Sequence, residues 1–481
     1  MSNILYVASE ISPYASTGGL ADVAGSLPLA LLHSGHLVRS IMPMYRQVLE
    51  GGFDLRDTGL RFNIPVGFRS FKAEIWSTTV NGLETFFVRR DEFFDRSNLY
   101  NLPDRDYDDN FERFVFFQKS VVAFIDAAGS KPDIVHGNDW QAGLLPLFLS
   151  YGINGLGRKR LEKFVFTIHN LAYQGLFSGS EFSVTNLPFS CFGVETMEFY
   201  GNINCLKNGI TCADRVTTVS ETYTREIQTE EQGYGLQGVI TAASPKLRGI
   251  VNGIDTKVWN PSADPHLKHS FSAASLAGKK DCRRDVLDRF GLDASPKTPV
   301  VAMVSRLVDQ KGLDLLEQSI SEILGLDLVF VLLGRGDEKY ERLAGTWRVR
   351  WPETFGLQVG FDIAAGHQII AGADILLMPS KAEPCGLNQL YALRYGTVPL
   401  VHEVGGLADT IHDVDVHGPL GNGFTFRDYT TKDLLSSLRR ALTLFGKPAE
   451  WNRLQLRGMS EDNSWLKSAR LYGEVYKDAT E

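Results

Sequence analysis

The strongest constraint on the fold of this chain is a pattern of strand, glycine-bearing turn and helix that occurs in both halves. In the first half, ILYVASE at residues 4–10 precedes STGGLADVAGSLPLALLHSG at 16–35, whose apolar residues recur at helical spacing. In the second half, PVVAMVSRLV at 299–308 precedes the helical pattern LDLLEQSISEILG. Strands that alternate with helices predict an α/β protein with doubly wound parallel sheets. A strand-like insert at about 60–100 is expected to add an antiparallel edge.

The length of the chain favours two domains, since 481 residues exceed one ordinary hydrophobic core. The segment KLRGIVNGIDTKVWNPSADPHL at 246–267 is rich in Gly, Pro, Asn and Asp, which is typical of a hinge. We therefore predict one domain over 1–245 and another over 246–457. The amphipathic pattern NSWLKSARLYGEVY at 463–476 predicts a helix that packs on one of them.

Charge and cysteine content limit the classes of function. A formal net charge of −8 argues against a general binder of nucleic acid, so a phosphate-bearing ligand needs local cations or helix ends. The five cysteines are scattered and form no CxxC pair, as expected for reduced thiols in the cytoplasm without a zinc site. No apolar run approaches the ~18 residues of a membrane helix, and residues 4–8 indicate a buried strand rather than a signal peptide.

Two cations lie on the loop that follows the predicted strand VVAMVS at 300–305. Arg306 falls at the carboxyl end of the strand, where open α/β sheets bind ligands, and Lys311 comes just before the next helix. The guanidinium fork and the ammonium point charge suit a leaving diphosphate. A solvated basic turn explains these two residues equally well.

Other polar residues follow predicted strands in the same way. Glu383 lies beside an expected helix start at Leu387, with Gly386 allowing close approach. Its carboxylate is either a structural cap or an acceptor for sugar hydroxyls. His169 ends the strand KFVFTI and precedes Asn170, a position where a lone histidine is more often structural than catalytic.

An aspartate and a tryptophan, Asp139 and Trp140, follow the predicted strand DIVHGN. This pair is common in sugar-binding sites, because the indole packs on the C–H face of a pyranose while the carboxylate accepts its hydroxyls. Packing of Trp140 in the core is the alternative.

A five-residue echo, GGLAD, occurs at 18–22 and at 405–409. Each copy is expected to open a helix, whose free N–H groups and dipole attract an anion, although coincidence is the alternative. All these candidates fall at the carboxyl ends of predicted parallel strands in two domains. Their convergence predicts a ligand cleft between the domains.

Several longer segments resemble the bacterial glycogen synthases and plant starch synthases. STGGLADVAGSLP, FTIHNLAYQG, NGID at 252–255, VSRLVDQKGLDL, EPCGLNQLYALRYGT and VGGLADTI occur in this order, and the match runs from Ile4 to about Tyr476. The resemblance implies a GT-B fold, two Rossmann-like domains with the active site in the cleft between them. It also implies that a C-terminal helix over 458–481 completes the N-terminal, acceptor-side domain, and that the C-terminal domain binds the nucleotide sugar.

The implied activity is transfer of glucose from ADP-glucose to the non-reducing end of an α-1,4-glucan, with retention and without a metal or cofactor. By the same resemblance, Arg306 and Lys311 stabilise the diphosphate, Glu383 holds hydroxyls of the donor glucose, and His169 contacts that glucose near the reacting carbon. The implied substrate-binding residues are Ser16, Gly18, Gly19, Asp22, Asp139, Trp140, Asn170, Asn252, Phe361, Gly386, Leu387, Gly405, Gly406 and Leu407. Phe361 would stack on adenine, Asp22 and Asn252 would line the donor site, and Asp139 and Trp140 would shape the acceptor side.

Two positions depart from the family pattern. Ser16 stands where the family has lysine before Thr-Gly-Gly-Leu, and Val404 stands where it has threonine. Both lie near the expected nucleotide and leave the donor open. The alternatives are a UDP-glucose-preferring or short-glucan enzyme of this fold and a non-catalytic glucan-binding protein. Glycogen phosphorylase, a longer enzyme that carries pyridoxal phosphate on a lysine, shows no match.

Overall fold

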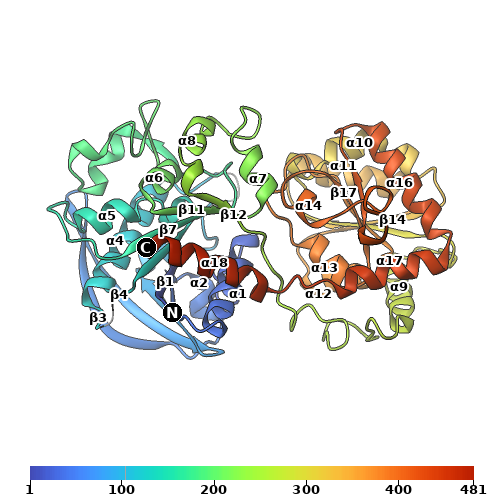
Figure 1. The fold of residues 1–481 in the computed structure, drawn as a ribbon, viewed down its shortest axis with the longest axis horizontal. Coiled ribbons are helices and arrows are strands. Elements are labelled where there is room, and N and C mark those ends of the chain that lie inside the picture. Colours follow the sequence, from blue (N-terminus) through green and yellow to red (C-terminus); the bar gives the residue numbers. More distant parts are fainter. Residues whose placement is uncertain (103–104, 130) are drawn as a thin grey trace. The chain divides into compact units, whose positions relative to one another are not determined.

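The computed structural model describes residues 1–102, 105–129 and 131–481, which form two compact units (Figure 1). Unit 1 comprises residues 1–252 and 465–481, and unit 2 comprises 253–464. These limits differ from the predicted domain limits by two short segments. Residues 247–249 form strand β12 of the unit 1 sheet, and helix α17 (Pro448–Ser460) continues past the predicted break at 457/458.

Unit 1 is built on a nine-stranded sheet with the order β12-β11-β7-β6-β1-β2-β5-β4-β3. The seven strands from β12 to β5 are parallel to one another, and β3 and β4 form an antiparallel edge. The expected antiparallel insert is therefore confirmed for two strands, whereas β5 joins the parallel sheet beside β2. The bounds are β1 (Asn3–Val7), β2 (Leu37–Pro43), β3 (Arg56–Val66), β4 (Arg69–Val80), β5 (Leu83–Arg89), β6 (Ile134–Asn138), β7 (Lys163–Ile168), β11 (Arg215–Thr218) and β12 (Leu247–Gly249).

The core of unit 1 explains the continuous apolar strand runs. All of Ile4–Val7 is at most 1% exposed, because helices such as α1 (Gly19–His33) and α4 (Asn110–Ala127) cover the sheet. The predicted C-terminal helix is α18 (Trp465–Thr480), which packs against α1 and β7. The hydroxyl of Tyr476 lies 2.8 Å from Nδ1 of the buried His136, whose Nε2 lies 2.6 Å from Oγ1 of Thr167. A polar contact thus fixes α18 on unit 1.

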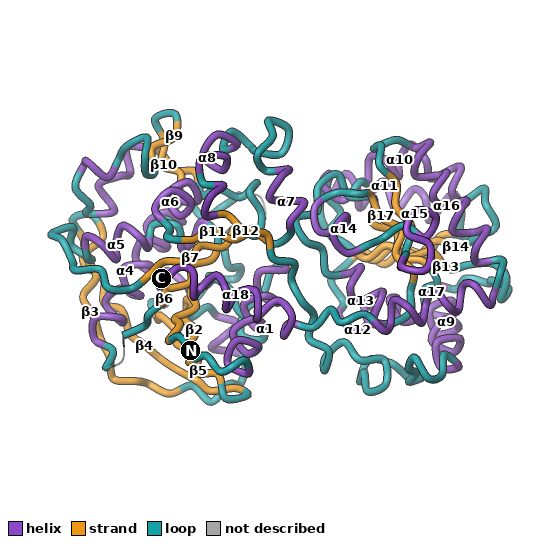
Figure 2. Tube along the Cα trace, viewed as in Figure 1, coloured by secondary structure: helices purple, strands orange, loops and turns teal. Residues whose placement is uncertain are grey.

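Unit 2 is built on a six-stranded parallel sheet surrounded by helices (Figure 2). Its order is β15-β14-β13-β16-β17-β18, which is 3-2-1-4-5-6 when counted from its first strand, the Rossmann order. In such a sheet ligands bind where the order reverses, here between the carboxyl ends of β13 and β16. In unit 1 the order reverses between β1 and β6. The bounds are β13 (Val300–Val304), β14 (Val329–Gly334), β15 (Phe355–Val359), β16 (Ile375–Met378), β17 (Val398–His402) and β18 (Phe424–Phe426).

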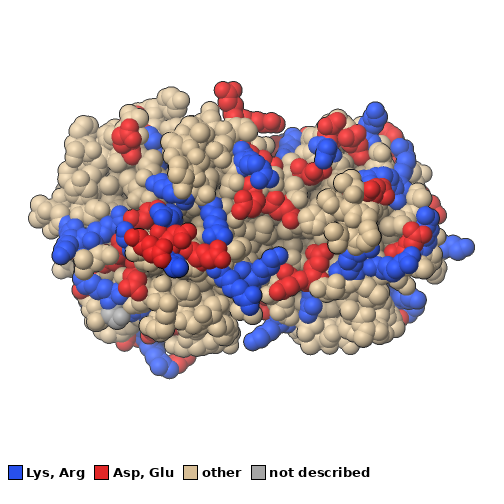
Figure 3. Space-filling view, viewed as in Figure 1, with Lys and Arg blue, Asp and Glu red and all other residues tan. Residues whose placement is uncertain are grey.

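The surface carries charges of both signs, interspersed with uncharged residues on the face drawn in Figure 3. An anionic ligand on this face must therefore rely on local groups rather than on a wide basic field. Within the described ranges, no helix combines the length and the apolar character that crossing a membrane requires.

Candidate active site

Unit 1 gathers buried polar side chains at the point where its strand order reverses. Glu10 follows β1, Asn138 ends β6, Asp139 follows it, and His169 follows the neighbouring strand β7. Glu10 is 4% exposed and accepts hydrogen bonds from the backbone N–H of Thr17, 2.5 Å away, and from the Thr17 hydroxyl. Burial raises the pKa of its carboxyl, and the Thr17 hydrogen bonds oppose that shift. Glu10 therefore fixes the loop that leads into α1.

His169 has a fixed ring orientation. Its Nε2 lies 2.9 Å from Oδ1 of the fully buried Asn138, whose amide donates to the carbonyl of Val7. Because Oδ1 of Asn138 is an acceptor, Nε2 of His169 carries the proton and Nδ1 keeps a lone pair. Although part of His169 remains accessible, the surrounding protein lowers its pKa to about 3. The ring is therefore neutral at pH 7, so His169 can orient a substrate by hydrogen bonding but is not a cation.

Asp139 supports the histidine loop. It has a left-handed backbone (φ 53°) and is 9% exposed, and its Oδ1 accepts the backbone N–H of His169 at 2.8 Å. Burial raises the pKa of the carboxyl to about 7, and the charge of Glu10 adds to the increase. The structure thus uses this carboxylate to hold the backbone of His169.

Trp140 is partly buried against other aromatic rings of unit 1. Its ring centroid lies 4.9 Å from that of Phe114 and 5.5 Å from that of Phe177. A Cβ atom at Gly175 would come within 2.6 Å of the indole, so the loop after His169 passes directly against it. The indole supports this loop but remains partly exposed, and its expected acceptor role stays a prediction.

The start of α1 is open. Ser16, Gly18, Gly19 and Asp22 are exposed, and a Cβ atom at either glycine would meet no atom within 4 Å. Gly18 is the N-cap, so the first GGLAD copy opens a helix as predicted. Asn170 lies in the histidine loop, where its Oδ1 accepts the N–H of Ala172.

Unit 2 brings Lys311 and Glu383 together at its own reversal point. Lys311 lies in the short helix η5 (Asp309–Lys311) after β13, and Glu383 follows β16, the adjacent strand. The Lys311 ammonium forms an ion pair with Oε2 of Glu383, which also accepts the Ser380 hydroxyl at 3.0 Å. The side chains of Lys311 and Glu383 are 17% and 8% exposed. An ammonium has three donors, so this pair leaves Lys311 with donors for a further anion. The guanidinium-bearing Arg306 lies exposed on the same loop.

Glycines hold the unit 2 loops against one another. Gly312 has φ 80°, and a Cβ atom there would lie 2.0 Å from the carbonyl oxygen of Pro379. The backbone N–H of Lys381 donates to the carbonyl of Gln310 at 2.9 Å. The loop with Lys311 and the loop with Glu383 are therefore locked together.

The second GGLAD copy differs from the first in its surroundings. It opens α14 (Gly405–Thr410), as predicted, but a Cβ atom at Gly406 would lie 2.2 Å from the carbonyl oxygen of Cys385. The N–H of Gly406 donates to the Glu383 carbonyl at 3.0 Å, and that of Leu407 donates to Val404. The expectation of free N–H groups at this helix end is thus wrong for these two residues. The loop that contains Glu383 supplies the acceptor of Gly406, and the N-cap Val404 supplies that of Leu407.

The remaining candidates have varied environments. Leu407 is fully buried in a cluster with Leu376 and Val401, so its side chain is not available to a ligand. Phe361 is 88% exposed after β15, as a stacking role requires. Asn252 is 6% exposed, and its Oδ1 has no hydrogen-bond donor within the described part of the chain. Gly386 has φ 71°, and Leu387 is the N-cap of α13 (Asn388–Arg394), which confirms the predicted helix start.

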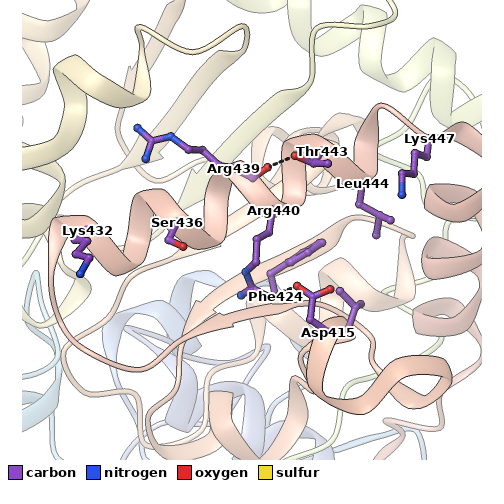
Figure 4. A pocket seen from close by; sticks show the side chains of 10 residues that line it. Asp415, Phe424, Lys432, Ser436, Arg439, Arg440, Thr443, Leu444 and Lys447 are labelled. Carbon is purple, nitrogen blue, oxygen red and sulfur yellow. Dashed lines mark hydrogen bonds and ion pairs between the residues drawn. The ribbon is translucent and has the colours of Figure 1, made fainter.

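An open surface pocket of about 600 Å³ lies elsewhere in unit 2, between α16 (Thr431–Phe445), α15 (Val414–His417) and β18 (Figure 4). Its cations include Arg440, which is already paired with Asp413 at 2.8 Å and Asp415 at 2.6 Å. None of the predicted site residues lines this pocket, and we give it no part in the proposed function.

Comparison with known proteins identifies the family. The model of the starch synthase catalytic domain matches residues 3–242, and that of the group 1 glycosyl transferases matches 287–453. A glycogen synthase of Syntrophotalea carbinolica is 42% identical over 479 residues, which cover 100% of this chain and 99% of the relative. The chain belongs to the glycogen and starch synthase family.

Solved structures agree with this family assignment. The catalytic domain of starch synthase IV from Arabidopsis thaliana, bound to ADP and acarbose, is 34% identical with a TM-score of 0.90, covering 100% of this chain and 99% of that one. A sucrose-phosphate synthase from Thermosynechococcus elongatus, 15% identical with a TM-score of 0.60, shares the fold over 99% of this chain and 98% of its own. The GT-B fold of two doubly wound units, predicted from the family motifs, is confirmed.

The sequence patterns did not identify two polar residues of the unit 1 site in this member of the glycogen and starch synthase family, Glu10 and Asn138. Asn138 ends β6, and Glu10 is a charged residue two positions after a buried apolar run. That position alone could have marked Glu10. The partners that define the two residues, Thr17 and His169, follow only from the fold.

Proposed function

We propose that this chain is a glycogen synthase, a retaining glycosyltransferase that moves glucose from ADP-glucose to the non-reducing end of an α-1,4-glucan. The observation that carries the proposal is the Lys311–Glu383 pair at the reversal point of the Rossmann sheet in unit 2. One cation for phosphate and one carboxylate for sugar hydroxyls lie there side by side, as a nucleoside diphosphate sugar requires. The full-length relatives support the glucan as acceptor.

The proposed reaction breaks the bond between glucose C1 and the phosphate oxygen. The acceptor 4-hydroxyl oxygen bonds to C1 on the face that the diphosphate leaves, and its proton passes to the departing phosphate oxygen. Positive charge develops on the sugar and negative charge on the diphosphate. Arg306 and Lys311 stabilise the diphosphate, while Glu383 holds donor hydroxyls. Neutral His169 binds the donor glucose near C1 without taking a proton, and Phe361 stacks on the adenine.

The two buried carboxylates of unit 1, Glu10 and Asp139, are consistent with positive charge developing on the sugar. Burial raises the pKa of both carboxyls, and the charge of Glu10 raises the pKa of Asp139 further, so a nearby positive charge is favourable there. Both use carboxylate oxygens to hold backbone N–H groups of Thr17 and His169. We therefore assign them to support of the loops and to the local field, and not to attack on C1.

The decisive experiment measures transfer of radiolabelled glucose to glycogen from ADP-glucose and from UDP-glucose at equal concentration. We expect faster incorporation from ADP-glucose, and products that an α-1,4-specific amylase degrades, since retention preserves the α-linkage. Preference for UDP-glucose would select the first alternative, and glycogen binding without transfer would select the non-catalytic one. Parallel assays with EDTA test the expected metal independence.

The proposal also places the enzyme in the cytoplasm, with ADP-glucose and glucan as its substrates and without a membrane or nucleic acid partner. All five cysteines are free thiols, and four of them are buried. Free thiols suit a reducing compartment. A cell fractionation in which the activity follows a cytoplasmic marker is the expected result.

A further inference from the structure

Two tyrosines of unit 1 have a backbone conformation that tyrosine rarely adopts. Tyr200 has φ 50° and Tyr234 has φ 48°, and each precedes a glycine, with φ 80° at Gly201 and 83° at Gly235. The other non-glycine residues with positive φ in the described ranges are Asn81, Asp139 and Asn186, types that tolerate this region. The same strained Tyr-Gly turn therefore occurs twice, with tyrosine at a position where asparagine, aspartate or glycine is usual.

Both strained tyrosines also expose their rings. Tyr200 is 85% exposed and Tyr234 is 47% exposed. A third tyrosine, Tyr173, is 53% exposed in the loop that begins with His169. Burial of the ring does not offset the unfavourable backbone, and strain of this kind concentrates at ligand-binding positions.

One buried glutamine connects the three tyrosine segments. Gln174, next to Tyr173, is 6% exposed and donates to the carbonyl of Tyr234 at 3.0 Å. Its Oε1 accepts the amide of Asn204 at 2.7 Å, and Asn204 ends β10 (Asn202–Asn204), the strand that follows the Tyr200 turn. The centroid of the Phe199 ring lies 4.7 Å from that of the Tyr200 ring. A Cβ atom at Gly235 would come within 3.1 Å of the same Phe199 ring. The Tyr200 and Tyr234 turns are thus neighbours.

The turn that carries Tyr200 is held firmly. It joins β9 (Glu198–Phe199) to β10 and protrudes at the edge of unit 1 in Figure 2. The N–H of Gly201 donates to the Glu198 carboxylate at 2.7 Å, and Lys207 donates to the Glu198 carbonyl at 2.6 Å. The ring is therefore presented in advance, which reduces the entropy lost on binding.

We propose that Tyr173, Tyr200 and Tyr234 form a platform that binds the α-1,4-glucan chain away from the reacting glucose. This inference rests on the proposed function, in which the acceptor is a polymer much longer than the one residue that reacts. Tyrosine suits a pyranose, because its ring packs on the C–H face and its hydroxyl bonds to sugar hydroxyls. The platform begins in the loop of His169, so a bound chain would continue toward the donor glucose.

The test measures affinity for glycogen by native electrophoresis of the full chain in gels that contain glycogen. Tyr200→Asn and Tyr234→Asn remove the rings, while asparagine tolerates the left-handed backbone. We expect the double asparagine variant to bind glycogen about tenfold more weakly, with a thermal midpoint no lower than that of the wild type. Its KM for glycogen should rise more than its KM for maltotriose, which is too short to cover the platform. Tyr200→Phe and Tyr234→Phe are the matched controls and should retain affinity within about twofold.

Glycogen affinity that is unchanged in the double asparagine variant would overturn the platform. A change of oligomeric state with unchanged glycogen affinity would instead identify a contact between copies, and it would overturn the proposal too. Glycogen binding and glucose transfer are measured separately, so failure of the platform and failure of the proposed glucosyltransferase activity can be distinguished. Weaker glycogen binding by the asparagine variants supports the platform even if the wild type transfers no glucose. Normal transfer with equal glycogen binding in all variants refutes the platform alone.

Discussion

Lys311 and Glu383 form an ion pair that joins the loops after two adjacent strands of the unit 2 sheet. The pair is mostly buried, so each charge compensates the other in a site with little water. Removal of one partner therefore has two effects, since it deletes a functional group and leaves the opposite charge unpaired. Arg306 is exposed on the same loop as Lys311, so removal of its guanidinium should leave a smaller penalty from unpaired charge than removal of the Lys311 ammonium.

Lys311→Ala and Arg306→Ala are each expected to lower kcat by about a hundredfold, because each removes a positioned charge from the leaving diphosphate. Lys311→Ala should also lower the thermal midpoint, since it leaves Glu383 unpaired. Lys339, an exposed lysine paired with Asp309, is the matched control, and Lys339→Ala should change kcat by less than about twofold. Initial rates at saturating ADP-glucose and thermal melts measure both effects. A rise in KM alone would mean that these cations bind only the ground state.

His169→Ala is expected to retain less than about a tenth of wild-type turnover while it still binds ADP. In the proposed function the imidazole contributes a positioned hydrogen bond, whereas Arg306 and Lys311, the groups proposed to stabilise the diphosphate, belong to unit 2. Because burial keeps the His169 pKa near 3, the pH–rate profile of the wild type should show no limb from this ring between pH 6 and 8. Turnover assays and ADP titration test both statements. Near-normal turnover would make His169 a structural residue.

Asp139→Asn is expected to change how stability depends on pH. The Asp139 carboxyl ionises near pH 7 in the folded chain, against a reference value of 3.8. Between these values the unfolded state binds fewer protons, so this group lowers wild-type stability as pH rises from about 4 to 7, by on the order of a few kcal/mol. Asparagine stays neutral and can still accept the N–H of His169. Urea unfolding at pH 5 and pH 8 should show the variant gaining stability relative to wild type at the higher pH, and equal changes would contradict the raised pKa.

Ser16→Lys is expected to lower the KM for ADP-glucose about fivefold, with little change in kcat. Ser16 is exposed just before the open start of α1, where the family resemblance predicts the donor diphosphate. A partly exposed charge-assisted contact contributes about 1 kcal/mol, which corresponds to that factor. Without donor, the lysine meets the positive end of the helix dipole, so stability should fall by some tenths of a kcal/mol. An unchanged KM would show that another residue already fills this role.

Gly312→Ala is expected to destabilise unit 2 by about 2 kcal/mol or more. The residue has φ 80°, and the new methyl would lie 2.0 Å from the Pro379 carbonyl oxygen, a backbone atom that cannot rotate away. Gly345 is the matched control, because it lies within α11 (Glu338–Arg350) with no atom within 4 Å of a Cβ. Gly345→Ala should stabilise the chain by about 0.5–1 kcal/mol. Urea denaturation measures both, and a neutral Gly312→Ala would show that the two loops can separate.

The sequence predicted the alternation of strands and helices because buried parallel strands are continuously apolar, as in Ile4–Val7. It did not predict that β13 lies beside β16 while β14 lies on its other side. That order depends on contacts between residues far apart in the chain, which periodicity does not record. The proximity of Lys311 to Glu383 follows from this strand order.

The two GGLAD copies show a second limit. Identical residues predicted two equivalent helix ends, and both helices are present. Only the start of α1 is open, because Gly405 and Gly406 pack against the backbone of Glu383 and Cys385. The GGLAD sequence specifies where a helix starts. Whether that helix start is open to a ligand depends on which loop from elsewhere in the chain packs against it.

Unit 1 is interrupted in the sequence, since α18 follows the whole of unit 2. During translation, the ribosome therefore completes residues 253–464 before His136 can meet Tyr476. Until α18 is synthesised, the surfaces of α1 and β7 that bind it stay uncovered in the nascent chain. Synthesis of unit 2 is therefore complete before that of unit 1, although unit 1 begins first. A premature stop codon near the 3′ end of the message would consequently damage the domain that was synthesised first.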